Sequence, residues 1–451
     1  MIKATKQAFG LVCLLCLAQG SEAAEIAVET QAPGVDHHQH LLSDAGAALL
    51  NAPELAAGVP DEVLTLLRAQ ESAWDDPTRL APLFTEQGVW LDGVQGGAGW
   101  IQGREQAATR LSQTFASAYQ ILPVFWHRQG DAGHLAVLYS RGDGARRRNV
   151  GTGVLALERD PASGTWRMAM QAPRFPGPAL EAPLDADALV ALLDKAGIAR
   201  AVVLSIAYWF QSPTYANADA DTRTRAENAW TAEQVARHPQ RLVGFCSVNP
   251  LRDEALAIVD ACARDARFRG LKLHFASSQV DLGQAAHVEK VRAVFAVANA
   301  GGLALVVHTR TGDGYGARDA RVVVNELLPA APDVTIQIAH LWGGGAFSAD
   351  ALAVFAEAVS TGVPATRHLV FDLSDVAYGA GPAGQQALVA RRIREIGLDR
   401  VFYGSDAAYL GHPGPADSWA YFRKEMPFTE AEFGGIAGNE APYLRTARRV
   451  P

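Results

Sequence analysis

Residues 302–308 read GLALVVH, an uninterrupted apolar run that ends in a histidine, and residues 333–340 read DVTIQIAH, with the same ending. Apolar runs of this length, rich in β-branched residues, are typical of strands that are buried on both faces of a parallel sheet. In parallel barrels the active site is built at the carboxyl ends of the strands, where both histidines would lie. These two runs therefore predict a fold class and the place of a functional site.

Five further runs of this kind alternate with segments of helical period. The runs span 200–206, 241–247, 269–274, 367–373 and 400–406, and helices are predicted at 184–196, 222–238, 252–266, 284–299, 348–360 and 384–396. Seven strands are one short of an eight-stranded barrel, and the missing strand is predicted at 33–41 (PGVDHHQHL). The sequence thus predicts an α/β fold, a (β/α)8 TIM barrel.

The chain between the first predicted strand and residue 179 has a different pattern. Amphipathic helices are predicted at 60–71 and 102–118, and residues 120–175 contain alternating, aromatic-rich runs with turn residues between them. This pattern is typical of an α+β domain with antiparallel strands. We expect the lead-in and barrel strand 1 at 24–53, an inserted domain at 54–178 and the rest of the barrel at 179–451.

The first 23 residues have the pattern of a secretory signal peptide. Lys3 and Lys6 precede an apolar stretch from Phe9 to Ala18, and Ser21-Glu22-Ala23 is a small-x-small cleavage site. We expect cleavage after Ala23 and an exported protein, periplasmic or secreted; an uncleaved anchor is the alternative. The apolar stretch is far shorter than the ~20 residues of a spanning helix, so no membrane span is expected.

Composition narrows the class of protein further. The 451 residues include 49% hydrophobic and 20% charged residues, a globular balance. Forty Lys and Arg against 48 Asp and Glu give a net charge of -8, so no nucleic-acid partner is expected. After the signal peptide only Cys246 and Cys262 remain. An oxidising compartment permits a disulfide between them, but we expect two buried thiols.

The densest polar cluster, DHHQH at residues 36–40, lies on the predicted first strand. Because residues i and i+2 of a strand share a face, His38 and His40 can converge on one metal ion. Three later strands end in a further candidate ligand, namely His308, His340 and Asp406. Imidazoles with one carboxylate suit zinc, and also manganese, iron or cobalt. We expect one divalent ion, and zinc is the first candidate.

These motifs resemble the amidohydrolase superfamily, specifically its amidohydrolase-related, aminocarboxymuconate-semialdehyde-decarboxylase-like branch. The matching elements are D-x-H-x-H (36–40), VVH (306–308), AH-x-x-GGG (339–345), FDLS (371–374) and GSD (404–406), and the resemblance covers about 33–42 and 181–447. The family often follows GSD with an aromatic or small residue and Pro, whereas this chain has Ala407-Ala408, so the rim of the pocket is not matched.

The resemblance implies a metal-dependent enzyme and a role for each matching residue. It makes His38, His40 and His308 metal ligands and Asp406 a fourth ligand or the general base. His340 would polarise the substrate or shuttle a proton. A carboxylate beside a metal can also take a proton from water, which supports the role of Asp406 on chemical grounds.

Four further side chains are candidates for substrate binding: Lys272, His274, Arg310 and Tyr208. Lys272 shares a strand face with His274, and we expect Lys272 or Arg310 to pair with a substrate carboxylate, with a structural ion pair as the alternative. Tyr208 lines the pocket or packs at its rim. In some binuclear relatives a lysine on strand four is carbamylated and bridges two metals, so the resemblance leaves a second ion at Lys272 open.

The predicted insertion resembles a nuclear-transport-factor-2-like, or SnoaL-like, α+β cone. The matching features are the first amphipathic helix, LFTEQGVWLDG (83–93), a W-x-x-GREQA element that starts at Trp100, and long strands. Such folds bind small apolar ligands, isomerise them through a carboxylate, or dimerise. Asp92 is the available acid nearest the usual region, but we expect it to lie in a surface turn. We expect packing, a homodimer interface or coverage of the pocket.

Together these features predict an exported metal-dependent hydrolase that cleaves an ester, lactone or amide bond of a small molecule, with Asp406 as the base. The alternative is a metal-dependent non-oxidative decarboxylase of an aromatic or enoic carboxylic acid. A third hypothesis, a non-catalytic binding or scaffolding protein, is disfavoured by the five candidate metal-site positions.

Overall fold

The computed structural model describes residues 31–50, 56, 58–92, 99–114, 119–141, 148–174, 183–213, 219–310, 314–343, 347–379, 385–406 and 414–445. The predicted signal peptide (1–23), both predicted boundaries of the insertion, two glycines of the AH-x-x-GGG element and Ala407-Ala408 lie outside the described residues.

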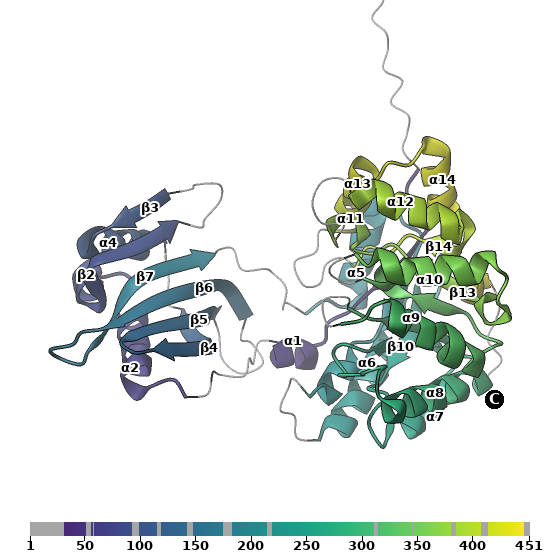
Figure 1. Ribbon diagram of the computed structural model, residues 1–451, viewed down its shortest axis with the longest axis horizontal. Helices are drawn as coiled ribbons and strands as arrows, with labels where there is room; N and C mark the ends of the chain where they lie inside the picture. The colour runs from purple at the N-terminus through teal and green to yellow at the C-terminus, as the bar shows by residue number, and fades with distance from the viewer. Residues whose placement is uncertain are drawn as a thin grey trace, which may run out of the picture. The chain divides into compact units, whose positions relative to one another are not determined.

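Eight parallel strands form one sheet and follow one another in chain order (Figure 1). They are β1 (Val35–Gln39), β8 (Arg200–Leu204), β9 (Leu242–Ser247), β10 (Phe268–His274), β11 (Ala304–His308), β12 (Ile336–Ile338), β13 (Leu369–Asp372) and β14 (Val401–Phe402). The sheet closes through backbone bonds from His37 N to Tyr403 O and from Asp406 N to His38 O, each 2.9 Å. The predicted TIM barrel is confirmed.

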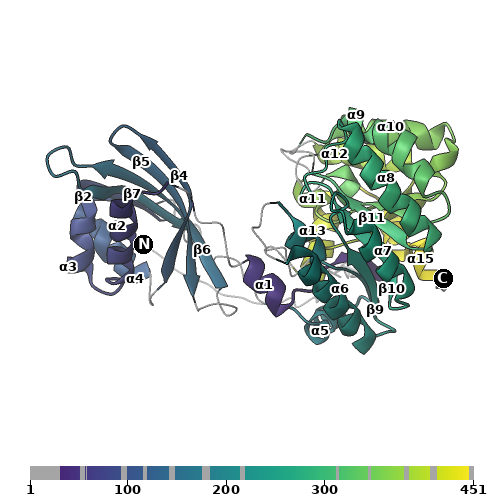
Figure 2. The same ribbon diagram turned by 90° about the horizontal axis from the view of Figure 1, so that it is seen from below.

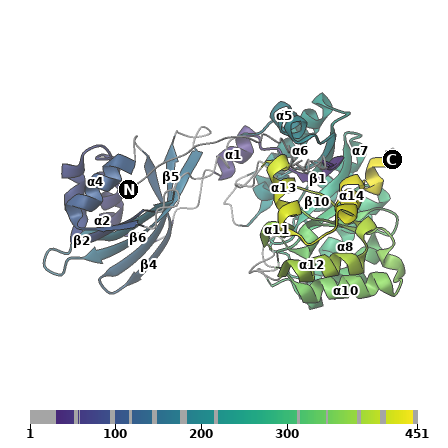
Figure 3. The same cartoon turned by 90° about the horizontal axis from the view of Figure 1, so that it is seen from above.

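Helices alternate with these strands and surround the barrel (Figures 2 and 3). They are α5 (Ala186–Ala196), α6 (Ala220–Arg237), α7 (Ala255–Arg264), α8 (Ala285–Ala300), α9 (Ala317–Val322), α10 (Ala349–Ser360) and α12 (Gln385–Ile396), with α1 (Asp44–Leu50) and α11 (Val376–Gly379) after strands and α13 (Pro415–Glu425), α14 (Glu430–Gly438) and α15 (Pro442–Arg445) at the end. The sequence of helix α5 shows why it begins and ends where it does. The Asp185 carboxylate caps its first turn, and Gly197, with φ 69°, ends it.

Buried apolar side chains of the helices and strands form the main core. Leu189 and Leu193 of α5, for example, are fully buried against it, and each such side chain contributes roughly 1.5–3 kcal/mol. No helix of the described ranges combines the length and the apolarity that crossing a bilayer requires.

A second, six-stranded sheet has its own core. In sheet order its strands are β3 (Gly99–Gln102), β2 (Phe84–Asp92), β7 (Trp166–Arg174), β6 (Arg148–Arg159), β5 (Ala132–Arg141) and β4 (Gln120–Gln129). Helices α2 (Asp61–Glu71), α3 (Pro77–Leu80) and α4 (Arg104–Thr114) accompany them, and α2 and α4 lie close to the positions that the sequence predicts.

The expected antiparallel character of this sheet needs one correction, because β2 pairs with β7 in parallel while the other pairs are antiparallel. Helix α4 connects β3 to β4 and carries the chain back between them. Strands β4 to β7 then alternate in direction, and β7 runs parallel to β2. A parallel pair needs such a crossover, because a short hairpin joins antiparallel strands only.

The expectation of two free thiols is wrong, because Cys246 on β9 and Cys262 on α7 form a disulfide. Their Cα atoms are 6.3 Å apart, within the ~4.4–6.8 Å that a disulfide spans. Helix α7 directly follows β9 and packs on it, which brings the two buried side chains together.

Replacing both cysteines (Cys246→Ser with Cys262→Ser) should lower the free energy of unfolding by about 3 kcal/mol, because the bridge closes a short loop in the unfolded chain. Urea unfolding of the oxidised protein and of the double variant measures this. The wild-type protein unfolded in the presence of a reductant is the control and should match the variant. Equal stability of all three would contradict the bridge.

Candidate metal centre

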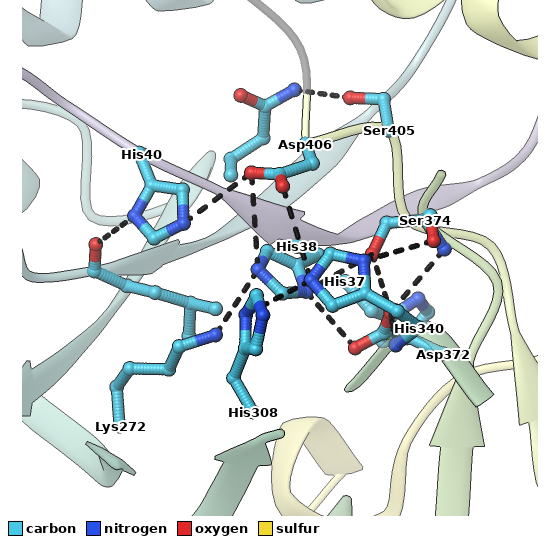
Figure 4. Close-up of polar contacts among 12 residues, drawn as sticks. His37, His38, His40, Lys272, His308, His340, Asp372, Ser374, Ser405 and Asp406 are labelled. Carbon is cyan, nitrogen blue, oxygen red and sulfur yellow. Dashed lines mark hydrogen bonds and ion pairs between the residues drawn. The ribbon is translucent and has the colours of Figure 1, made fainter. Parts of the chain in front are cut away.

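Polar side chains from six barrel strands meet at the carboxyl ends of these strands (Figure 4). They are His38 and His40 of β1 and its end, Lys272 and His274 of β10, His308 of β11, His340 after β12, Asp372 of β13 and Asp406 after β14. All of them are buried, the most exposed being His308 at 8%. The fold therefore brings together residues that lie up to 368 positions apart in the sequence.

The hydrogen bonds of three histidines orient their rings. His38 Nδ1 donates to Asp372 Oδ2 (3.0 Å), His40 Nδ1 to Leu204 O (2.7 Å) and His340 Nδ1 to Ser374 O (2.9 Å). A neutral imidazole that donates from Nδ1 carries a lone pair on Nε2. In two of these rings burial favours the neutral form, because it lowers the pKa of His40 to about 3 and that of His340 to about 4.

The three Nε2 atoms face one carboxylate. Asp406 Oδ1 lies 3.4 Å from His40 Nε2 and 3.9 Å from His38 Nε2, and Asp406 Oδ2 lies 3.9 Å from His340 Nε2. Lone pairs and carboxylate oxygens repel one another unless a cation or a proton lies between them. Ligand atoms about 2.0–2.2 Å from a tetrahedral ion are roughly 3.3–3.6 Å apart, so this set fits a divalent metal.

Ligand atoms within 4.8 Å of one another form three groups of candidate metal ligands among the described residues. They are His38, His40 and Asp406; His38, His340 and Asp372; and His340, Asp375 and Asp406. The first group contains three of the four predicted ligands. His340, which we expect to act on the substrate, has its ring nitrogen as close to Asp406 as that of His38.

His308 reaches this cluster through His340. Its Nδ1 lies 3.1 Å from His340 Nε2, and its buried Nε2 has no hydrogen-bond partner among the described residues. A buried polar atom without a partner costs stability unless a ligand satisfies it. The role of His308 as a metal ligand stays a prediction, which the lack of a hydrogen-bond partner for its Nε2 among the described residues supports.

Lys272 points at the candidate metal centre. Its Nζ lies 3.2 Å from His38 Nε2, and its side chain is fully buried. Burial lowers the pKa of Lys272 to about 8, although Asp406 and Asp372 oppose that shift. In this position the ammonium group donates to a candidate ligand atom, which is a different contact from the expected pair with a substrate carboxylate.

Asp372 holds parts of the cluster in place through hydrogen bonds to its carboxylate. Its carboxylate accepts hydrogen bonds from His38 Nδ1, from Gln337 Nε2 (2.7 Å) and from the backbone N of His340 (3.0 Å) and Ser374 (3.2 Å). Burial alone would raise its pKa, but His38 and His340 hold the pKa of Asp372 far below its usual range. A carboxylate that orients a ligating imidazole in this way raises its affinity for metal.

Asp375 is a third carboxyl group at the candidate centre, after Asp372 and Asp406. Its ligand atom lies within 4.8 Å of those of His340 and Asp406. Burial, followed by the charges of Asp406 and Asp372, raises the pKa of Asp375 well above its usual range. One carboxyl group of the Asp375–Asp406 pair therefore retains a proton more readily than an isolated aspartate.

Backbone strain is concentrated at the same strand ends. Five of the seven non-glycine residues with positive φ in the described ranges follow β12, β13 or β14: His340 (53°), Leu341 (48°), Trp342 (71°), Asp375 (59°) and Asp406 (49°). Such conformations cost about 1–3 kcal/mol each and persist where the surroundings enforce them, often at functional sites. Gly404 is required nearby, because a Cβ there would lie 2.8 Å from His38 Cβ.

Of the other residues predicted to bind substrate, His274 and Tyr208 are buried near the candidate centre, and Arg310 is exposed. The ring of His274 stacks on His308 at 3.8 Å between centroids, and the Tyr208 ring lies 5.0 Å from that of His274. Tyr208 and His274 are both buried, whereas Arg310 is exposed beyond the end of β11. His274 thus belongs to the centre, and Tyr208 packs against it.

Sequence reasoning assigned no role to Asp372, Ser374 or Asp375. Asp372 lies one residue before the end of the predicted strand 367–373, so the position near a strand end that indicates His308 also indicates Asp372. Asp36 of the D-x-H-x-H motif has a structural role: it accepts hydrogen bonds from the backbone N of Ser405 (3.0 Å) and of His38 (3.2 Å) and joins β1 to the Asp406 loop.

This chain is similar to one protein family and to several solved structures. The model of the family described as Amidohydrolase matches residues 181–439. No curated protein sequence matches the chain. Three similar solved structures are 5-carboxyvanillate decarboxylase from Sphingomonas paucimobilis (18% identity, 58% of this chain and 82% of that chain, TM-score 0.41), a putative amidohydrolase from Staphylococcus aureus (16%, 58%, 91%, 0.42) and an amidohydrolase from Burkholderia multivorans with bound zinc (16%, 60%, 89%, 0.40).

Replacing Asp372 by Asn should weaken metal binding by roughly ten- to a hundredfold, because the Nδ1–H of His38 would lose a charged acceptor. Titration of metal into chelator-treated protein measures the Kd. Asp260→Asn, which removes an exposed carboxylate that pairs with Arg264, is the control and should bind metal as the wild-type protein does. An unchanged Kd in a folded Asp372→Asn variant would contradict the bracing role.

Proposed function

Because the chain belongs to the amidohydrolase family, whose members are metal-dependent enzymes, we propose that it hydrolyses an ester, lactone or amide bond of a small molecule. The observation that carries the proposal is the convergence of His38, His40 and His340 Nε2 on the Asp406 carboxylate. That set of atoms is suited to bind a divalent cation and to act on a bond beside it.

We infer that His38, His40 and Asp406 hold the ion, with the bare Nε2 of His308 as a further ligand. Zinc is our first choice for nitrogen and carboxylate donors, with manganese, iron or cobalt as alternatives and a second ion near Lys272 as a variant of the same site. When bound, such an ion supplies a Lewis acid and lowers the pKa of water toward ~7.

Side chains of the protein would then transfer the proton that the water loses. Asp406 would accept a proton from water as the general base. His340, whose Nε2 lone pair lies 3.9 Å from Asp406 Oδ2, would take that proton up, and its protonated ring would stabilise the developing charge or pass the proton to the leaving group. The contact of His340 Nε2 with His308 Nδ1 (3.1 Å) couples the two rings. Lys272 and Arg310 stay the candidates for pairing with a substrate carboxylate, and Arg310 lies exposed beyond β11.

Asp375 favours a second candidate, a non-oxidative decarboxylase of an aromatic or enoic carboxylic acid. In that reaction a C–C bond breaks, carbon dioxide leaves, and the carbon must take up a proton. A half-buried carboxyl group with a raised pKa beside Asp406 is suited to donate that proton. Both reactions would use the same metal-binding residues, so the product must decide between them.

We also propose that the protein is exported and that residues 54–178 form a SnoaL-like cone inserted after barrel strand 1. Export is supported by the N-terminal pattern and by the disulfide between Cys246 and Cys262, since disulfides persist in oxidising compartments. The cone is supported by a curved mixed sheet with helices α2 and α4 on one face (Figure 2).

Turnover of a panel of esters, lactones, amides and aromatic or enoic acids by the metal-loaded protein tests the reaction class. We expect hydrolytic products without carbon dioxide. Release of carbon dioxide without any hydrolytic product would replace the hydrolase proposal by the decarboxylase. Turnover of neither group would argue against both.

Two variants test the roles of the site residues. His308→Ala should lose metal, whereas Asp406→Asn should keep part of its metal and lose roughly 10²–10⁴-fold in turnover, since general-base catalysis typically contributes that factor. Metal content and initial rates measure the two effects. His368→Ala and Asp399→Asn, which lie before β13 and β14, are matched controls and should resemble the wild-type enzyme. Wild-type metal content and rates in both site variants would refute the roles.

A further inference from the structure

A cavity of about 420 Å³ lies at the amino ends of the barrel strands β8, β9 and β10, opposite the end that carries the candidate metal centre. Its volume is within the roughly 300–1,000 Å³ of small-molecule sites. Arg269, which lines the cavity, and His274 of the metal centre are both on β10, about 16 Å apart along the strand. The cavity is therefore separate from the site described above.

The wall of this cavity combines cationic and apolar side chains. Three arginines line it, Arg200, Arg267 and Arg269, and none of the described lining residues is acidic. The apolar part of the wall comes from the end of α6, the start of β9 and α15, namely Val235, Leu242, Val243 and Leu444. A wall of this composition is suited to a small molecule with an anionic group and an apolar body.

Two of the three arginines already have a carboxylate partner. Arg200 pairs with Glu440. Arg267 Nη2 lies 2.6 Å from Asp265 Oδ2. The Arg269 guanidinium, in contrast, has no ion pair or hydrogen bond with the side chain or backbone of any other described residue. Its positive charge and its donors are therefore available to a ligand in the cavity.

A β-bulge gives Arg269 its place in the cavity wall. Phe268 and Gly270 pair with two consecutive residues of β9, so Arg269 is an extra residue on β10. Phe268 and Leu271 both belong to the main core, although side chains three residues apart in a regular strand point to opposite faces. In a regular strand Arg269 would share the face of Leu271 and point into this apolar core. The bulge instead leaves its side chain at the cavity.

We propose that this cavity binds a small molecule that carries a carboxylate or phosphate group on an apolar body. The guanidinium of Arg269 can hold two oxygens of either group in a bidentate contact. The apolar wall contacts the body of the ligand and excludes water, which strengthens the ionic contact. This second site does not depend on the reaction that we propose for the metal centre.

Calorimetric titration of the full chain with benzoate, phenyl phosphate and benzyl alcohol tests the proposal. The three probes share a phenyl ring, and the first two carry the two kinds of anionic group. At least one of the two anions should bind, and benzyl alcohol, which has no charge, should bind at least about tenfold more weakly, because it cannot form the charge-assisted bonds. Which anion binds more tightly identifies the group that the site prefers.

Arg269→Gln should weaken the binding of that anion at least about tenfold, and Arg269→Lys, which keeps the charge but loses the planar fork, should weaken it measurably. Arg292→Gln, which removes an exposed arginine that pairs with Glu289 on α8, is the matched control and should bind as the wild-type protein does. Turnover at the metal centre without the probe should be unchanged in all three variants.

Circular dichroism establishes whether Arg269→Gln is folded, and Arg269→Lys decides the question if it is not. The proposal would be overturned if neither anion bound, or if benzyl alcohol bound as tightly as the anions. It would also be overturned if an anion bound equally well to the wild-type protein and to the Arg269 variants, as binding at the metal centre alone would give.

Discussion

The crowding of acceptor atoms around Asp406 is the constraint on which the barrel end depends. Three histidines donate a hydrogen bond from Nδ1 to a protein oxygen, so three Nε2 lone pairs point toward one carboxylate; they are His38, His40 and His340. In a buried environment such an arrangement is unfavourable without a positive charge at its centre. The buried ammonium of Lys272 lies against His38 and supplies one such charge, and a divalent cation would supply more.

The rest of the barrel end holds these acceptors in place. Asp372 fixes the ring of His38 and the backbone of His340, and Asp36 fixes the loop that carries Asp406. The positive φ angles of His340, Asp375 and Asp406 add strain at the same places. A hydrophobic core that surrounds all eight strands offsets this cost, so stability is exchanged for a fixed geometry at the site.

Much of the barrel could be predicted, because strands that are buried on both faces must be apolar throughout and so are distinct in sequence. Residues 302–308 show this, and the i, i+2 spacing of His38 and His40 predicts their shared face. Other features depend on distance in space. The contact of Lys272 with His38 and the bond between Cys246 and Cys262 arise from how neighbouring elements pack, which local patterns do not encode. The parallel pairing of β2 with β7 likewise depends on the path of α4.

The most direct test of a metal centre at Asp406 is X-ray absorption spectroscopy of the purified, metal-loaded protein. The spectrum should show nitrogen and oxygen ligands at about 2.0–2.2 Å, together with the outer-shell scattering of at least two imidazole rings. A bound metal without imidazole scattering, or a protein that takes up no divalent metal, would contradict the assignment of His38, His40 and Asp406 as its ligands.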